Sequence, residues 1–146
     1  FGYQGRSLDP KAKMRYITIM LNEEAPKVYG LDRIEQDKTV YVVEGPFDST
    51  FVKNSVALCG SDGSLAHLEG SSLVFVYDNE PRNKEIVDRI ERCIDREERV
   101  VIWPSNVRQK DINDMVLAGH NVQGIIEYNI YSGLKAKLKF NTWKKV

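Results

Sequence analysis

The chain has 146 residues, of which 42% are hydrophobic, with a mean hydropathy of −0.41 and a formal net charge of +0, values typical of one globular domain or one domain with a small neighbour. No apolar run approaches the length of a membrane span and no signal peptide pattern is present, so we expect a cytoplasmic protein without membrane contact. The spacing of Cys59, Cys93, His67 and His120 excludes a zinc knuckle and a disulfide framework, and both thiols are expected to be free.

Charge is distributed unevenly along the chain. Residues 1–20 carry four basic side chains and one acid, and residues 130–146 carry five lysines and no acid, so the segment between them is acidic. This pattern predicts an acidic centre that holds cations, flanked by basic arms that hold phosphates. A solvated lysine surface is the alternative for each arm.

The N-terminal residues read as a hairpin. Residues 1–8 and 14–20 are predicted to be short strands, with a turn at Asp9–Pro10 between them. Arg6, Lys13 and Arg15 lie there among aromatic residues, a mixture that suits a nucleotide or the backbone of a single-stranded nucleic acid. Packing of these aromatic rings in a core is the alternative. A loop at residues 22–26 and a short helix at residues 28–34 should lead into the next strand.

Three later segments have the composition of strands that are buried on both faces: residues 40–43, 73–77 and 100–103. Acidic residues follow each of them. Because right-handed crossovers bring the ends of successive parallel strands to one edge of a sheet, we expect these acids to converge there. Glu44, Asp78 and Glu80 would repel one another unless a cation lay between them, and Mg²⁺ or Mn²⁺ prefers such oxygen ligands. Capping of helix N-termini is the alternative role for Asp111 and Asp114.

The segments between these strands alternate between helix and strand. After Pro81, apolar residues recur at helical spacing, and residues 134–140 alternate apolar residues with lysines, which fits an amphipathic strand, with the end of a helix as the alternative. The other predicted elements are helices at 48–54, near 65–68, near 115–118 and at 122–128, a strand at 55–59, and a tight loop at 60–63.

Several motifs occur in the order that characterises a known family. Val-Val-Glu44-Gly45-x-x-Asp48, Val-Tyr-Asp78-x-Glu80 and Lys110-Asp111-x-x-Asp114 resemble the TOPRIM domain of bacterial-type primases, type IA and type II topoisomerases and some nucleases. The preceding Phe-Gly-Tyr-Gln-Gly-Arg6 and Lys27-Val-Tyr-Gly-Leu-Asp-Arg33 are similar to the stretch before TOPRIM in DnaG-type primases. The combination looks most like the primases of large tailed phages.

This resemblance implies an α/β fold. Residues 38–119 would form a TOPRIM domain, a Rossmann-like and mostly parallel sheet flanked by helices. Residues 1–37 would be part of a small β-rich basic subdomain, and residues 120–146 a helical, basic C-terminal tail. Family primases carry a zinc module ahead of this region, so zinc is expected only there, and the chain is expected to be the C-terminal catalytic part of such a primase, which could be inactive alone.

The implied activity is metal-dependent, template-directed synthesis of short RNA primers on single-stranded DNA for phage replication. Its substrates would be nucleoside triphosphates, its cofactor Mg²⁺ or Mn²⁺, and its partner a hexameric replicative helicase in the host cytoplasm. Asp78 and Glu80 would be metal ligands, and Glu44 a ligand or proton acceptor. Most TOPRIM domains have Asp-x-Asp where this chain has Asp78-Asn79-Glu80, and glutamate reaches about one methylene further. The supporting acids would be Asp48, Asp111 and Asp114, and the nucleotide or nucleic-acid contacts Arg6, Lys13, Arg15, Arg82, Lys84 and Lys110.

Three other functions are compatible with parts of the pattern. A TOPRIM nuclease or topoisomerase fragment would use the same acids to cleave phosphodiester bonds, although a topoisomerase also needs a tyrosine nucleophile in another domain. A non-catalytic interaction domain would use the acids as helix caps and its lysine-rich tail as a docking site. A receiver-type phosphoacceptor would need a pair of acids on its first strand, where this chain offers Glu44 alone.

Overall fold

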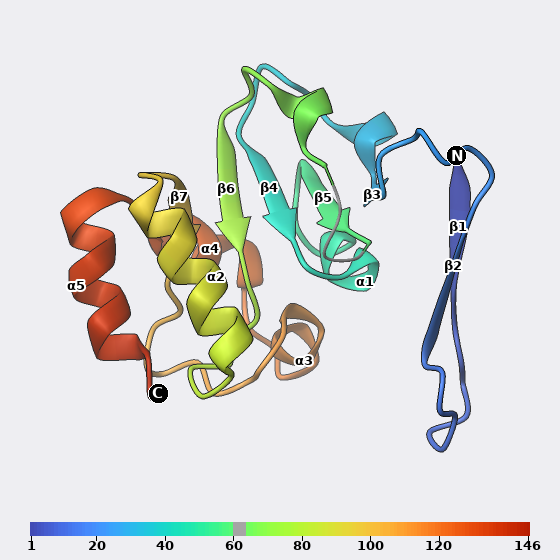
Figure 1. Cartoon of the computed structure of the whole chain (residues 1–146). Helices are drawn as coiled ribbons and strands as arrows, with labels where there is room; N and C mark the ends of the chain where they lie inside the picture. Colours follow the sequence, from blue (N-terminus) through green and yellow to red (C-terminus); the bar gives the residue numbers. More distant parts are fainter. Residues whose placement is uncertain (60–63) are drawn as a thin grey trace.

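The computed structural model describes residues 1–59 and 64–146 and shows an α/β fold, as predicted (Figure 1). Its main sheet has six strands in the order β3-β5-β4-β6-β7-β8. The four central strands are parallel, and the two edge strands run antiparallel to their neighbours. The loop predicted at residues 60–63 lies outside the described residues. The strands are β3 (Val28–Tyr29), β4 (Val40–Val43), β5 (Ser55–Leu58), β6 (Leu73–Val76), β7 (Arg99–Val101) and β8 (Ile130–Tyr131).

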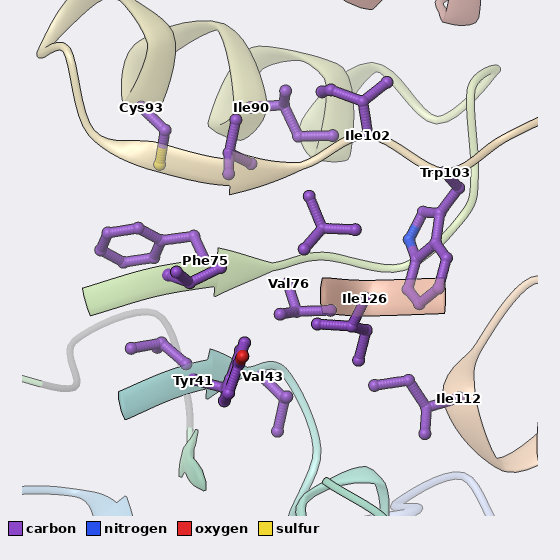
Figure 2. Packing of buried hydrophobic residues seen from close by; sticks show 14 of the residues in the cluster. Tyr41, Val43, Phe75, Val76, Ile90, Cys93, Ile102, Trp103, Ile112 and Ile126 are labelled. Carbon is purple, nitrogen blue, oxygen red and sulfur yellow. The ribbon is translucent and has the colours of Figure 1, made fainter. Parts of the chain in front are cut away.

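The central strands form because their sequences are apolar throughout. All four residues of β4 are buried, and Val42 pairs with Val56 of β5 on one side and Phe75 of β6 on the other. Val76 of β6, Trp103 just after β7 and Ile126 of α4 (Val122–Tyr128) lie together in the core (Figure 2). The continuous apolar runs therefore mark the centre of the sheet, as the sequence predicted.

Helices cover the sheet on both faces. The chain goes from β4 to β5 at one edge of β4, and then returns past β4 to β6 and β7 at its other edge. Because each connection is right-handed, this reversal places the connecting helices on opposite faces. The long helix α2 (Lys84–Asp95) lies beside α5 (Gly133–Trp143) (Figure 1). Asn83 caps α2 by accepting a hydrogen bond from the N–H of Glu85 at 3.1 Å. The buried face of α2 is the predicted one: Ile86, Val87, Ile90, Cys93 and Ile94. The shorter helices are α1 (Pro46–Ser49), α3 (Ile112–Leu117) and two 3₁₀ turns, η1 (Leu31–Arg33) and η2 (Ala66–Leu68).

Three predicted elements differ from the structure. The helix expected at residues 28–34 is divided, because Val28–Tyr29 pairs with β5 and Gly30 turns the chain at a φ of 92° before η1. The helix expected at residues 48–54 is limited to α1, since the chain turns back into β5 through Asn54 at a φ of 47°.

The third difference concerns residues 134–140, which form part of helix α5. The preferred prediction of a strand is wrong here, and the helix given as its alternative is the one observed. Ala136, Phe140 and Trp143 are buried at helical spacing, whereas Leu134 and Leu138 are exposed. The alternation with lysine misled the interpretation, because a strand would have placed all the apolar residues on one face.

The hairpin predicted at the N-terminus is confirmed, with β1 (Gly2–Arg6) paired antiparallel to β2 (Tyr16–Met20). It stands apart from the six-stranded sheet (Figure 1). Tyr3 and Tyr16 are 60% and 51% exposed, so these rings do not form a core within the described residues. The guanidinium of Arg6 lies 5.4 Å from the centroid of the Tyr16 ring. Cys59 and Cys93 are free thiols, as predicted, and no helix in the described ranges is long and apolar enough to span a membrane.

Candidate acidic site at the sheet edge

The predicted acids follow the strands that flank the point where the strand order reverses. The four parallel strands, taken in chain order, are arranged 2-1-3-4, and the reversal lies between β4 and β6. Ligands of open α/β sheets bind outside the carboxyl ends of the strands at this point. Glu44 directly follows β4, and Asp78 lies two residues beyond the end of β6. The fold therefore places both acids at the usual binding edge.

Glu44 is held by two partners. Its Oε2 accepts a hydrogen bond from the backbone N–H of Asp78 at 3.0 Å, and its Oε1 lies 2.8 Å from Nη1 of Arg89 on α2. The other guanidinium nitrogen of Arg89 pairs with Glu85 one helical turn earlier. Burial raises the pKa of Glu44, and both the Asp78 N–H and Arg89 oppose that rise. The position of this carboxylate is thus fixed by β6 and α2 together.

Asp78 and Asp48 both have strongly raised pKa values. Burial is the largest cause for Asp78, followed by the negative charges of Glu44, Asp48, Asp111 and Glu80, and together they raise its pKa to about 7. Burial also raises the pKa of Asp48 to about 6, with further contributions from Asp111, Glu44 and Asp114. Because these carboxylates act on one another, we treat them as one acidic cluster: Glu44, Asp48, Asp78, Glu80, Asp111 and Asp114.

Asp48 connects α1 with α3. Its Oδ1 accepts a hydrogen bond from the N–H of Asn113 at 3.1 Å. Its Oδ2 lies so close to Gly45 that a Cβ there would be 2.8 Å away, so a larger residue at this position would require the Asp48 side chain to shift. Asp111 performs the capping role considered in the sequence, because its Oδ1 accepts from the N–H of Asp114 at 2.8 Å at the start of α3.

Glu80 and the basic residues around it have other partners. The side-chain amide of Asn83 donates to Oε2 of Glu80 at 3.2 Å. Lys84 pairs with Asp88 on its own helix at 2.9 Å, Arg82 is exposed, and Lys110 lies 3.7 Å from Asp111. Arg82 and Lys84 follow Glu80 in the chain, and Lys110 precedes Asp111. All three cations are thus adjacent to the acidic loops.

The chemistry of the cluster fits a hard divalent cation, because all its donors are carboxylate oxygens. Within residues 1–59 and 64–146, however, no three Asp, Glu, His or Cys side chains are arranged to enclose a metal ion. Both oxygens of Glu44 already have partners, Arg89 and the N–H of Asp78. The donor set is thus gathered at one edge, and side-chain rotation would be needed to close it around a cation.

A comparison with known proteins bears on these observations. The chain is 39% identical over 150 aligned positions to the DNA primase of Enterobacteria phage T4. This chain is related to a phage DNA primase. The alignment covers 99% of the chain and 44% of that primase, so the chain spans less than half the length of its relative. No protein-family model matches the chain. The predicted resemblance to phage primases is thereby supported, while the TOPRIM assignment stays a prediction.

Three of the predicted basic residues lie elsewhere in this primase-related chain. Arg6, Lys13 and Arg15 are on the N-terminal hairpin, which stands apart from the sheet (Figure 1). Lys13 and Arg15 precede β2, and Arg15 donates to the carbonyl of Pro10 at 3.1 Å. The structure therefore brings the acids together but leaves these three cations separate from them.

Sequence reasoning overlooked three residues that support the cluster in this primase-related chain. Helical spacing places Arg89 outside the apolar face of α2, Asn79 is the unspecified position of the Asp78-x-Glu80 motif, and Trp143 belongs to none of the motifs. Each contacts a residue far away in the sequence, for example Arg89 with Glu44. Local spacing carries no signal for such pairs. The one local signal is the amide of Asn79, which lies directly between two acids at the end of a strand.

Proposed function

We propose that this chain is part of the catalytic region of a DNA primase. In this proposal residues 38–119 form a TOPRIM domain whose acidic cluster binds Mg²⁺ or Mn²⁺, and the protein joins nucleoside triphosphates on a single-stranded DNA template. The observation that carries the proposal is the convergence of the Glu44 and Asp78 carboxylates at the strand-order reversal. The similarity to a phage DNA primase supports it. We also propose that the protein interacts with a hexameric replicative helicase in the host cytoplasm.

The residues of the cluster would divide the task among them. Asp78 and Glu80 would offer oxygens to the cation, with Asp48, Asp111 and Asp114 adding negative charge around it. A bound divalent cation supplies charge neutralisation for phosphate oxygens. Glu44, oriented by Arg89 and the Asp78 N–H, would act as a further ligand or accept the proton of the attacking hydroxyl.

The basic residues would hold phosphates from two sides. Arg82, Lys84 and Lys110 lie next to the acidic loops and would contact the triphosphate. Arg6, Lys13 and Arg15 share the hairpin with exposed aromatic rings, a combination that suits single-stranded template.

Nucleotide binding tests the proposal. Calorimetry with a nucleoside triphosphate, with and without Mn²⁺, would be made on the unaltered chain and on Asp78→Asn. We expect binding that requires Mn²⁺ and weakens at least about 10-fold in the variant, because loss of a residue that merely orients a metal ligand already costs about 10–100-fold in metal affinity. Asp95→Asn is the matched control, because Asp95 is an exposed acid on α2 that pairs with Lys137. A folded chain that binds neither Mn²⁺ nor nucleotide would contradict the proposal.

The same samples separate the proposal from its alternatives. A nuclease would shorten single-stranded DNA in Mn²⁺ without retaining a triphosphate. A non-catalytic interaction domain would do neither, and Asp78→Asn would then leave all ligand measurements unchanged.

A further inference from the structure

Asn79, between Asp78 and Glu80, directs both polar atoms of its side chain and its backbone N–H to other parts of the protein. Its Nδ2 donates to the carbonyls of Val107 and Gln109, each at 3.0 Å, and its backbone N–H donates to the carbonyl of Lys110 at 2.6 Å. Its Oδ1 accepts a hydrogen bond from the indole Nε1 of Trp143 at 2.9 Å. The side chain therefore acts as a cross-link and is not directed at a ligand.

This cross-link joins the two loops that carry the acids. One loop bears Asp78 and Glu80 after β6, and the other ends at Lys110, immediately before Asp111 and helix α3. Because three donors of Asn79 bond to carbonyls of the second loop, movement of either loop would break several hydrogen bonds at once. Asn79 thus ties the loop that carries Asp78 to the loop that leads into Asp111.

The C-terminal end of α5 supports the same loop at a second point. Trp143 is buried, and its ring stacks near Phe140 with 6.2 Å between centroids. Two residues later, the backbone N–H of Lys145 donates to the carbonyl of Pro81 at 2.8 Å. Asn79 and Pro81 are the two neighbours of Glu80 in the chain, so the end of α5 contacts the side chain of the residue before this acid and the backbone of the residue after it.

We propose that Asn79, Trp143 and the Lys145 N–H form a clamp through which the C-terminal helix positions Asp78 and Glu80. The clamp residues are positioning residues, since Asn79 and the Lys145 N–H contact the backbone of the acidic loops and Trp143 contacts the side chain of Asn79. This inference rests on the proposed function, because it assigns the clamp to the placement of the metal ligands. The end of α5 is then part of the site's framework and not a free basic tail.

Removal of one donor tests the clamp. Trp143→Phe keeps an aromatic ring but leaves Oδ1 of Asn79 without its partner. We expect Mn²⁺ affinity to fall about 10-fold, as for other residues that orient metal ligands. Val56→Ala is the control for general destabilisation, because Val56 is fully buried in β5 and remote from α5. This control should lower the melting temperature and leave Mn²⁺ affinity unchanged.

A second pair of variants isolates the backbone contact. Lys145→Pro removes the N–H that bonds to Pro81, whereas Lys145→Ala keeps it. Lys144 already has a φ of −62° and a ψ of 145°, values that suit a residue before proline. We expect the proline variant to lose Mn²⁺ affinity and the alanine variant to match the unaltered chain. Equal affinities in both variants would count against the contact at Pro81.

Amide hydrogen exchange on the metal-free protein keeps this inference separate from the proposed function. In Trp143→Phe we expect the Asn79 backbone N–H to exchange about 10-fold faster, since the loop loses one hydrogen bond. If the unaltered chain binds no Mn²⁺, the metal function fails, and faster exchange at Asn79 would still establish the clamp on the loop. Unchanged exchange at Asn79 in Trp143→Phe would overturn the clamp.

Discussion

The backbone N–H of Asp78 donates a 3.0 Å hydrogen bond to Oε2 of Glu44, so the acid after β4 and the acid after β6 are joined directly. The second oxygen of Glu44 pairs with Arg89 on α2 at 2.8 Å. The end of β4, the loop after β6 and helix α2 thus fix the position of the Glu44 carboxylate before any ligand is bound. Such fixed positions are needed in a site whose acids repel one another and would otherwise move apart.

Loss of the Arg89 charge should destabilise the protein measurably. Arg89 and Glu44 have side chains that are 27% and 20% exposed, which is between a surface pair and a buried one. We expect Arg89→Gln to lower the free energy of unfolding by about 1–2 kcal/mol, because Glu44 would keep its burial and lose its cation. Urea unfolding measures this change.

Arg92→Gln provides the comparison on the same helix. Arg92 is exposed and donates to the carbonyl of Asp88 at 3.2 Å, without contact to the acidic cluster. Its replacement should change stability by less than about 0.5 kcal/mol. Equal losses of unfolding free energy in the two variants would show that the ion pair between Arg89 and Glu44 does not stabilise the fold.

The stability of the metal-free protein should fall as the pH rises from about 4 to 7. Burial and the charges of Glu44, Asp48, Asp111 and Glu80 raise the pKa of Asp78 to about 7, above its ordinary value near 3.8. The folded state therefore binds more protons than the unfolded state in this range, and the free energy of unfolding decreases with increasing pH. Urea unfolding in a chelator at pH 5 and pH 8 measures the slope.

Asp78→Asn removes one of the titrating groups and should make that pH dependence weaker. Asp48, whose pKa is raised to about 6, should supply the part that remains. A slope that is the same with and without the Asp78 carboxyl would mean that this group is not perturbed in the folded protein.

The sequence predicted the centre of the fold well because local composition determines it. The short, β-branched and aromatic runs that became β4 and β6 are typical of strands buried on both faces, and a parallel arrangement then brings Glu44 and Asp78 to one edge. The supporting contacts could not be predicted in this way. Asn79 bonds to Trp143, 64 positions further along the chain, and such a pair depends on how α5 packs.

Helix α5 shows why a local pattern can mislead. Its apolar residues alternate with lysines, which is the period of a strand, yet they also recur at intervals of four and three from Ala136 through Phe140 to Trp143. Packing selects between the two periods, and here it buries the helical set. The alternation of apolar residues with lysines arises because Leu134 and Leu138 are exposed and do not belong to the buried set.

Two substitutions in α5 distinguish these periods in solution. Phe140 is 3% exposed and Leu138 is 62% exposed. Phe140→Ala should lower the free energy of unfolding by about 3–5 kcal/mol, as usual for a large side chain removed from a core. Leu138→Ala should change it by less than about 0.5 kcal/mol. Similar losses at both positions, measured by urea unfolding, would favour the strand.

The N-terminal hairpin should be the first part of the chain to yield to protease. Its two strands pair with each other, and its side chains are mostly exposed. A two-stranded hairpin without a packed face is only marginally stable in water. We therefore expect brief trypsin treatment to cleave between Lys11 and Arg15 well before it cleaves at Arg92 in α2. The trimmed protein should unfold at the same urea concentration as the whole chain, because the main sheet keeps its core. A hairpin that is cleaved no sooner than α2, or a large fall in the urea midpoint after trimming, would instead show that the hairpin packs on the sheet.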